Sequence, residues 1–598
     1  ENQNPKEEWN RLVGNFFVDI TPIKGLTFKS DVGTDISYGD ARNFKPKYYI
    51  SANDYMANNF LEHSYQKYFS WQWENTITYK HTFKDKHDIT LLAGMTAQEG
   101  TWDFLGASKT HIPNESPNLW YLDAATQNAT AGGRAWEWSM LSYLGRLHYS
   151  YASRYMLTLT MRRDGSSRFG TNNKWGMFPS AALGWNVHQE SFFANLADKI
   201  NTLKVRAGWG QIGNQEIGNY AFTTLINGGT TFVGYVFGVP QTLIAGAAPL
   251  TNANKDLKWE TTEQTNVDID MAVLNNRLSL SADYYIKDTK DMLVAVPVPG
   301  NVGLRYNALV NAGSIRNNGF EFTAEYKQTL GDFSYSVGGN FTTVKNKVIS
   351  LGGGEDIYSA PFFGEFLTRT REGDPIGSFY GYEIAGIFQD KYDVEEYVNS
   401  NGQQIQPNAN PGDFKFVNQN DDNKIDANDK VNLGSPIPKF TYGFNASLNY
   451  KSIDFQIFFQ GVYGNKIFNG NKYFTEGDGY TNLSVDMLNA WSGKGTSNTL
   501  PNPAGSANNR LASSRYIEDG SYLRLKNVQL GYTLPDATAK RIGLSRLRVY
   551  VAATNLLTIT KYTGFDPEIG VTNGLDLGVD RGTYPQARTF TIGATVNI

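Results

Sequence analysis

The sequence predicts an all-β protein, a transmembrane antiparallel β-barrel. Apolar and polar residues alternate with a period of two, in segments of roughly 9–11 residues, the length of a membrane-crossing strand. Connections between these segments alternate between short and long. Aromatic residues are abundant, with 35 Tyr, 35 Phe and 12 Trp, and many stand near segment ends, as in the aromatic girdles of membrane barrels.

The alternation is clearest in five segments, and each has one apolar and one polar face. These segments are residues 278–287, 320–327, 333–342, 442–450 and 590–598. A soluble β-sandwich gives the same pattern with its apolar face inward, so alternation alone does not decide between the two architectures.

The connections favour the membrane barrel, because such barrels have short periplasmic turns and long extracellular loops. The short connections are residues 21–25, 83–86, 274–276, 327–332 and 451–454. The long connections are residues 39–66, 100–135, 212–257, 348–438 and 464–514. We count about 17 strands, an odd number that places Ile598 on the side of the short turns. About five further strands before Glu1 would complete a 22-stranded barrel of the plugged transporter class.

One segment breaks the alternation. Leu523 and Leu525 share one parity, whereas Val528 and Leu530 share the other. A β-bulge near Lys526–Asn527 would bring all four side chains to one face. The alternative is a strand that begins only at Asn527.

Composition excludes several classes of protein. The chain of 598 residues has 54 basic and 58 acidic side chains and a net charge of -4, so we expect no nucleic-acid partner. It has no cysteine, which excludes disulfides, thiolate metal sites and cysteine nucleophiles. No apolar run reaches the ~18 residues of a membrane helix.

Motifs for catalysis are weak. The GxGxxG match at residues 208–213 lacks a following helix, so we expect a strand that enters a loop and not a dinucleotide site. The six histidines show no metal-ligand spacing, and no serine stands in a GxSxG turn. Acidic pairs such as Asp268 and Asp270 fall at strand spacing, which a hydrated polar face explains. A surface hydrolase that uses such carboxylates remains a minor alternative.

The sharpest local motif has the spacing of a calcium loop, and it lies in the long connection 348–438. Its candidate ligands are Asn418, Asn420, Asp422, Lys424, Asp426 and Asp429. Asn at the first position, Asn in place of the central Gly and Asp at the last position should weaken binding. We expect Ca²⁺ to bind weakly and to order the loop. The alternative is a solvated turn rich in Asx residues.

Aromatic residues also occur in the long connections, where exposed rings commonly bind a ligand or partner. They are Trp102, Phe104, Trp120, Tyr121, Phe232, Tyr235, Phe362, Phe363 and Phe366. The alternative is that these rings pack the loops against one another.

Several motifs, in order along the whole chain, resemble the SusC/RagA family of TonB-dependent outer-membrane transporters. They are RRDGSSRFG at 162–170, GWGQIGN at 208–214, WETT at 259–262, NAGSIRNNGFE at 311–321, GSPIP at 434–438, SYLRLKNVQLGY at 521–532, GFDPE at 564–568 and YPQAR at 584–588. The family's signal peptide, TonB box, plug and first strands have no counterpart in residues 1–598. We therefore expect this sequence to be the C-terminal part of a barrel.

The resemblance implies an active importer in the outer membrane of a Gram-negative bacterium of the Bacteroidota type, without cofactor or catalysis. The cargo would be an oligomeric nutrient, either an oligosaccharide or a peptide. The implied partners are a SusD-like surface lipoprotein, outer-membrane lipid and the TonB complex, the last through the missing N-terminal part. The family motifs look structural, so no substrate residue is carried over. A channel, secretion or adhesin barrel without a plug is the alternative.

Overall fold

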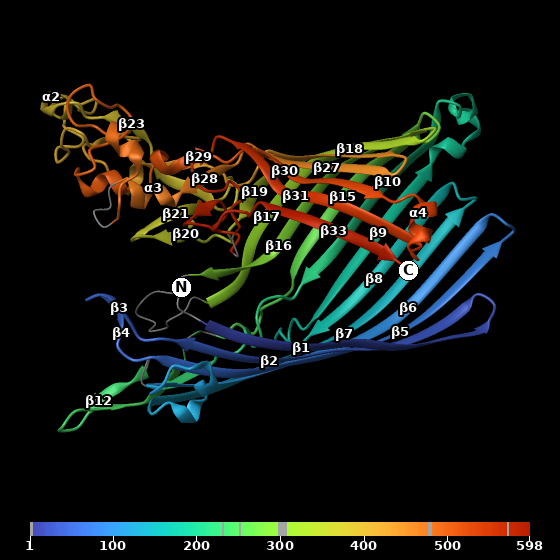
Figure 1. Cartoon of the computed structure of the whole chain (residues 1–598), viewed down its shortest axis with the longest axis horizontal. Coiled ribbons are helices and arrows are strands. Elements are labelled where there is room, and N and C mark those ends of the chain that lie inside the picture. Colours follow the sequence, from blue (N-terminus) through green and yellow to red (C-terminus); the bar gives the residue numbers. More distant parts are fainter. Residues whose placement is uncertain are drawn as a thin grey trace. The chain divides into compact units, whose positions relative to one another are not determined.

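The computed structural model describes residues 4–229, 233–249, 251, 253–296, 308–476, 481–570 and 573–598. Strands dominate, and the α-helices of the described residues are short: α2 (Lys391–Glu395), α3 (Gly470–Thr475) and α4 (Asp536–Arg541). Within the same residues, no helix has both the length and the hydropathy of a membrane span. The predicted all-β, antiparallel class is confirmed (Figure 1).

The chain divides into two compact units. Unit 1 comprises Glu1–Trp185, Gly208–Glu263 and Lys290–Asn311, and unit 2 comprises Asn186–Ala207, Gln264–Thr289 and Ala312–Ile598. Five strands have residues in both units: β9 (Trp175–Asn186), β10 (Ile200–Asn214), β15 (Glu260–Val273), β16 (Leu278–Val296) and β17 (Ala308–Leu330). The strand total and the closure of the sheet into a barrel stay predictions.

Unit 1 is built on a ladder of long antiparallel strands, each paired with the next along the chain. They are β1 (Asn4–Ile23), β2 (Leu26–Lys45), β5 (Phe60–Phe83), β6 (His87–Thr110), β7 (Gln127–Tyr151), β8 (Tyr155–Ser166) and β9 (Trp175–Asn186). Its connections carry short hairpins, β3 (Tyr48–Ser51) with β4 (Asp54–Met56), β11 (Ile226–Gly229) with β14 (Gly246–Pro249), and β12 (Tyr235–Phe237) with β13 (Thr242–Ile244).

Unit 2 has a ladder of its own, which begins with β17. It continues through β18 (Phe333–Thr343), β26 (Phe440–Tyr450), β27 (Ile453–Tyr463), β30 (Tyr522–Thr533), β31 (Arg546–Thr560) and β33 (Thr589–Asn597). Strand β19 (Lys345–Ser350) pairs with β17 beyond a one-residue break after β18.

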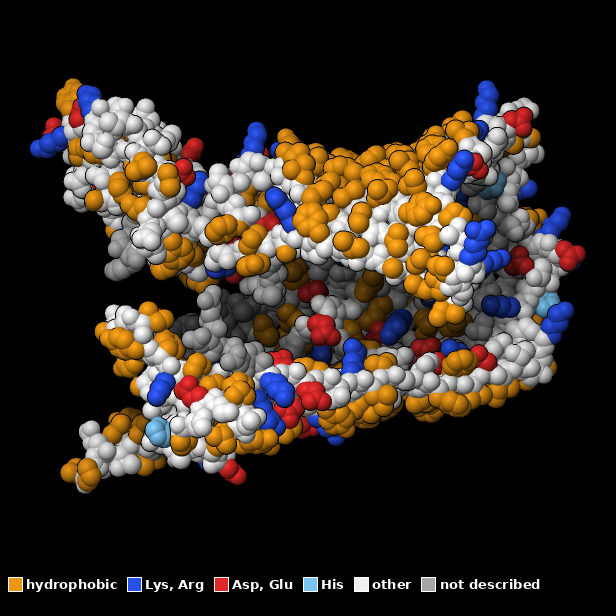
Figure 2. All heavy atoms as spheres, in the orientation of Figure 1, with side chains coloured by type: hydrophobic (Ala, Val, Ile, Leu, Met, Phe, Trp, Pro, Cys, Tyr) orange, Lys and Arg blue, Asp and Glu red, His pale blue; other side chains and the backbone are white. Residues whose placement is uncertain are grey.

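The register of unit 2 brings the predicted apolar faces together on one side of the sheet. One row across neighbouring strands consists of Tyr335, Leu448, Phe455, Leu530, Val551 and Ile592. Figure 2 shows hydrophobic side chains gathered over β27, β30, β31 and β33. An exposed apolar band across a sheet is what a lipid-facing surface requires.

The irregularity in β30 is a β-bulge, as one of the two sequence interpretations predicts. Phe458 and Phe459 of β27 pair with Asn527 and Leu525, so Lys526 is skipped. The pairing with β31 skips Lys526 as well. The extra residue places Leu525 and Val528 on one face despite their opposite parity.

Each predicted short connection contains a turn, although most of 327–332 belongs to β17, which ends at Leu330. Three long connections are wrong in extent: 464–514 continues to residue 521, and two others are too long. Strand β2 continues to Lys45 and β5 begins at Phe60, so residues 46–59 connect them. Similarly, residues 111–126 connect β6 to β7. Strands β5, β6 and β7 have 24, 24 and 25 residues. Each of them is therefore about 80 Å long. Each added pair satisfies main-chain hydrogen-bonding groups, so the hairpins extend well past the length that a membrane requires.

The long connections of unit 2 fold together into one structure, which we call the loop body: the described parts of residues 351–438, 464–521 and 561–588. It contains the sheet β20 (Ile357–Phe362), β21 (Glu365–Thr370), β22 (Ser378–Tyr382) and β25 (Lys430–Gly434), the pair β23 (Ile384–Ile387) and β24 (Phe414–Phe416), and the sheet β28 (Lys466–Asn469), β29 (Ile517–Asp519) and β32 (Val579–Asp580). Phe379, Phe468, Tyr516 and Val579 share one buried core, so all three connections contribute to it.

Candidate functional site

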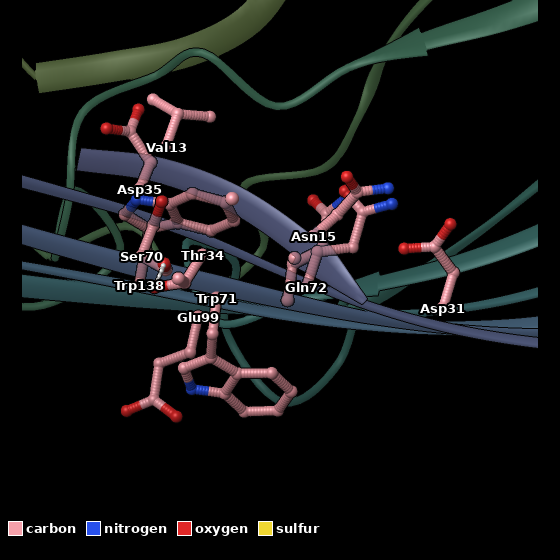
Figure 3. A pocket seen from close by; sticks show the side chains of 13 residues that line it. Val13, Asn15, Asp31, Thr34, Asp35, Ser70, Trp71, Gln72, Glu99 and Trp138 are labelled. Atoms are coloured by element: carbon pink, nitrogen blue, oxygen red, sulfur yellow. Dashed lines mark hydrogen bonds between the residues drawn. The ribbon is translucent and has the colours of Figure 1, made fainter. Parts of the chain in front are cut away.

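The polar face of the unit 1 ladder holds the candidate site. Val13, Asp35, Ser70, Gly100 and Trp138 lie in register across β1, β2, β5, β6 and β7. A cavity of about 460 Å³ lies against these strands, and its lining includes most of this row. In Figure 3, Val13 and Asn15 project to one side of the strands, whereas Trp71 and Glu99 project to the other.

The cavity is lined by hydrogen-bonding groups whose charges are partly neutralised. Arg11 donates from Nε and Nη2 to the two carboxylate oxygens of Asp35, at 2.9 and 2.6 Å. Gln72 and Gln98 form the neighbouring pair on the same face, two residues along from Ser70 and Gly100. There, Gln98 Nε2 donates to Gln72 Oε1 at 2.8 Å. Such carboxylate and carboxamide groups can pair with the polar groups of an uncharged ligand.

The indole of Trp138 lies directly over Gly100 of the neighbouring strand. A Cβ at position 100 would lie 2.5 Å from the indole Nε1, so any other residue there would push the ring away. Glycine therefore allows this large aromatic face to lie close to the sheet, beside the polar cavity.

Further aromatic side chains continue from Trp138 along the same face. Tyr68, Trp102 and Trp136 form the next row across β5, β6 and β7. The rings of Trp102 and Trp136 are 5.9 Å apart at 20°, and those of Trp102 and Phe104 are 5.9 Å apart at 18°. We call these five residues the aromatic strip: Tyr68, Trp102, Phe104, Trp136 and Trp138.

A guanidinium group accompanies the strip. Arg134 pairs with Phe104 across β6 and β7, and its Cζ lies 5.0 Å from the centre of the Phe104 ring and 5.6 Å from that of Trp102. This cation–π geometry places N–H donors directly beside flat apolar surfaces.

The structure separates the aromatic residues that the sequence places in loops. Trp102 and Phe104 lie in β6, not in a loop, and belong to the strip. Trp120 stacks on Phe44 at 4.8 Å, and Phe362 is buried in the loop body, so these two pack the connections. Phe232 lies outside the described residues. Tyr68, Trp136 and Trp138 were not predicted as site residues, because their common face becomes evident only from the strand register.

The predicted calcium loop is a network of side chain to main-chain hydrogen bonds. Asn418 Nδ2 donates to the Asp422 carbonyl at 2.6 Å, and Asn420 Nδ2 donates to Asp422 Oδ2 at 2.9 Å. Asp429 is buried and accepts from the main-chain N–H groups of Gln419 and Asp426, both at 2.8 Å. These contacts resemble the Asx-rich turn of the alternative interpretation.

Lys424 and Asp426 form the remaining part of this loop. Lys424 Nζ lies 2.6 Å from Asp426 Oδ2, and this hydrogen bond holds the pKa of the Asp426 carboxyl below its usual value. Asp426 also caps the short 3₁₀ helix Ala427–Asp429. Within the residues that the structure describes, no group of three or more His, Asp or Glu side chains is arranged to hold a metal ion. Calcium binding stays a prediction, and it requires Lys424 to leave Asp426.

The GxGxxG match and His148 lie within regular strands. The GxGxxG match falls inside β10, as expected for a strand and not a nucleotide-binding turn. His148 Nδ1 lies 2.9 Å from Thr158 Oγ1 in the β7–β8 pair, within a polar cross-strand contact.

The C-terminal motifs converge on one buried ionic cluster. Arg524 is only 2% exposed, and it donates to Asp566 Oδ1 at 2.6 Å and to Glu568 Oε2 at 2.7 Å. Lys526, the bulge residue, also reaches Glu568 at 2.7 Å. The main-chain N–H of Gln586 donates to Asp566 Oδ2 at 2.9 Å. The motifs at 521–532, 564–568 and 584–588 therefore fix the segment after β31 to β30.

The motif at 162–170 serves packing in unit 1. Phe169 is buried with Phe178, Leu257 and Trp259, and the rings of Phe169 and Trp259 are 4.9 Å apart. A Cβ at Gly170 would lie 2.6 Å from the Lys255 carbonyl oxygen, so the chain passes too closely for a larger residue.

Comparison with known proteins agrees with this architecture. The family described as TonB dependent receptor-like, beta-barrel matches residues 6–556. TonB-dependent receptor P3 of Formosa agariphila is 36% identical over 594 residues, which cover 97% of this chain and 57% of that protein. TonB-dependent receptor SusC of Bacteroides thetaiotaomicron is 29% identical over 620 residues, which cover 100% of this chain and 56% of that protein.

A solved structure of the RagAB peptide transporter superposes with a TM-score of 0.85 at 27% identity, and the match covers 100% of this chain and 62% of that one. This chain thus spans just over half the length of the curated relatives named above. It belongs to the SusC/RagA group of the TonB-dependent receptor β-barrel family, whose members reside in the outer membrane of Gram-negative bacteria.

Proposed function

We propose that this chain is the barrel part of a TonB-dependent importer of oligomeric nutrients, glycans or peptides, which works with a SusD-like surface lipoprotein. The polar face of unit 1 carries this proposal. It combines a cavity of about 460 Å³ with an aromatic strip and unusually long strands. The names of two relatives support it: one is SusC, and the other is described as a peptide transporter, RagAB.

The residues of this chain bind and orient the cargo, and no covalent bond is made or broken. Carboxylate and carboxamide groups at Asp35, Gln72 and Gln98 replace water around polar groups of the cargo. The aromatic strip offers flat apolar surface beside them. Energy comes from the TonB complex acting on a plug that precedes this part of the barrel, and the lipoprotein covers the loops on the outer surface.

Uptake by cells that produce the full-length protein tests the importer. We expect accumulation of labelled oligomers to require the receptor, to stop when TonB is deleted, and to stop when a protonophore removes the energy source. Uptake that persists without TonB would instead support the alternative, a channel without a plug. Degradation of the oligomer by the purified receptor would contradict the absence of catalysis.

Purification from native outer membranes tests the partner. We expect intact-mass analysis to find a surface lipoprotein together with the complete receptor. A receptor that purifies alone under mild detergent conditions, and remains folded on heating, would favour a channel or adhesin barrel.

A further inference from the structure

We propose that the aromatic strip is a saccharide subsite, in which pyranose rings stack on Trp102 and Trp136 while their hydroxyls pair with the adjacent polar groups. This inference rests on the proposed import function and names the chemical class of its cargo. It assigns binding to residues of three neighbouring strands, β5, β6 and β7.

The surface of the strip suits a ligand with alternating apolar and polar faces. The aromatic face carries negative charge density, which attracts the C–H groups on the flat side of a sugar ring. Tyr68 and Trp136 lie 6.2 Å apart, and Trp102 and Trp136 lie 5.9 Å apart, so the aromatic contact extends over more than one side chain. Tyr68, Trp102 and Trp136 are each partly exposed.

The neighbouring polar groups match sugar hydroxyls. Ser70 and Asp35 lie in the row of Trp138, and the Gln72–Gln98 pair lies one register step further. Arg134 adds N–H donors at the other end of the strip, beside Trp102. Carboxylate, carboxamide and guanidinium groups together supply both acceptors and donors, as polyhydroxylated ligands require.

A peptide could not bind at Tyr68 and Trp102 by adding a strand. The main chain at Tyr68 is paired on both sides, by β2 and β6, and that at Trp102 is paired by β5 and β7. In β7, the N–H groups of Glu137 and Ser139 already donate to Tyr220 Oη at 3.2 Å and Ser167 Oγ at 2.9 Å. Strand addition needs free main-chain groups, so recognition here depends on side chains.

The test is calorimetric titration of the full-length receptor in detergent with defined hexasaccharides. The neutral probes are cellohexaose, laminarihexaose and maltohexaose, and hexagalacturonate is the acidic probe. We expect at least one probe to bind, and Trp102→Ala and Trp136→Ala each to weaken binding by about 3- to 10-fold. Trp102→Phe should recover part of the loss, because a smaller aromatic face remains.

Trp73→Ala is the matched control. Trp73 lies in β5 on the opposite face, in register with Val32 and Ala97, and its replacement should leave saccharide binding unchanged. Arg134→Gln distinguishes the probes: a loss confined to hexagalacturonate indicates an acidic saccharide, and an equal loss for a neutral probe indicates hydroxyl recognition.

Three results would overturn the saccharide subsite: no probe binds the parent, the alanine variants bind like the parent, or a neutral Gly-Ser-Thr octapeptide binds with the same dependence on Trp102 and Trp136. Because the titration needs no energy source, it is independent of the import test. Saccharide binding that depends on the strip, without TonB-dependent uptake, would refute the importer alone. Uptake that persists while the alanine variants bind like the parent would refute the subsite alone.

Discussion

At the scale of single residues, Arg524 shows how one buried charge fixes a whole segment. Its guanidinium neutralises Asp566 and Glu568, and removal would leave Asp566 buried without a cation. Breaking a buried pair in this way costs about 3–5 kcal/mol. We expect Arg524→Met to increase hydrogen exchange at the main chain of residues 564–568, as local opening becomes easier.

Lys526→Met is the control for the Arg524 variant. Lys526 contacts Glu568, but its side chain is 21% exposed, so its loss should cost only about 1 kcal/mol or less. Arg524→Lys should fall between the two, because it keeps the charge but loses the planar, two-armed geometry. Unchanged exchange at residues 564–568 in Arg524→Met would show that the cluster does not hold the segment.

The loop Asn418–Asp429 poses a second question at this scale, because its oxygens can serve either turns or a metal. We expect calorimetry to detect weak, millimolar Ca²⁺ binding in the full-length protein. Asp422→Ala and Asp426→Ala should abolish the heat of binding, and Lys424→Ala should strengthen binding by freeing Asp426. Equal Ca²⁺ binding by the parent and the two aspartate variants would leave only the turn interpretation.

At the scale of elements, the hydrophobic pattern accounts for strands, faces and tight turns, since these depend on local chemistry. It also predicts a bulge near Lys526–Asn527 as one of two interpretations, because one inserted residue shifts the parity of every side chain that follows it in the strand. Strand ends are less accessible to sequence reasoning. Trp102, for example, extends its strand by main-chain pairing with Tyr68 and Trp136. Pairing between strands does not change the apolar–polar pattern of either strand, so the pattern does not predict where the strand ends.

Strand β29 shows an element held by one carboxylate. Glu518 accepts from Lys472 Nζ at 2.7 Å, from the Thr563 N–H at 2.8 Å and from Asn469 Nδ2 at 2.9 Å. Burial raises the pKa of the Glu518 carboxyl, but these donors outweigh burial and hold the pKa below its usual value. The ionised form therefore stabilises the sheet β28–β29–β32.

A lowered pKa in the folded state gives stability that is present above the unfolded value of about 4.3 and is lost as the pH falls through the folded value. We expect protection of the β28 main chain against hydrogen exchange to be constant from about pH 7 to 5 and to decline below about pH 4. Glu518→Gln should lower protection at neutral pH and flatten the acid response. An unchanged acid response in that variant would assign the decline to other groups.

At the scale of the whole molecule, the candidate site shows where sequence reasoning stops. Tyr68, Trp102 and Trp136 belong to three different strands, and only the register between those strands makes them neighbours. The loop body has the same property, because Phe379, Phe468 and Val579 come from three separate connections. Long-range pairing of this kind is set by the fold as a whole, whereas the pattern of each segment reports only its own faces.

The ladder of unit 2 should form without the largest connection, because its strands pair directly. Thr343 pairs with Phe440 at the end of β18 and β26, and the Val344 N–H donates to the Lys439 carbonyl at 3.4 Å. Replacing residues 345–438 by Asn-Gly would join these strands through a tight hairpin turn. We expect the full-length variant to reach the outer membrane and to keep the heat-dependent gel mobility of a folded barrel.

The rest of the loop body should respond differently to the same deletion. Phe468, Tyr516 and Val579 would lose Phe362, Leu367 and Phe379 from their shared core, so the connections 464–521 and 561–588 should become sensitive to protease. A deletion variant that fails to insert would show that the ladder depends on the loop body. One whose remaining connections stay resistant would show that they fold independently, contrary to the single core described here.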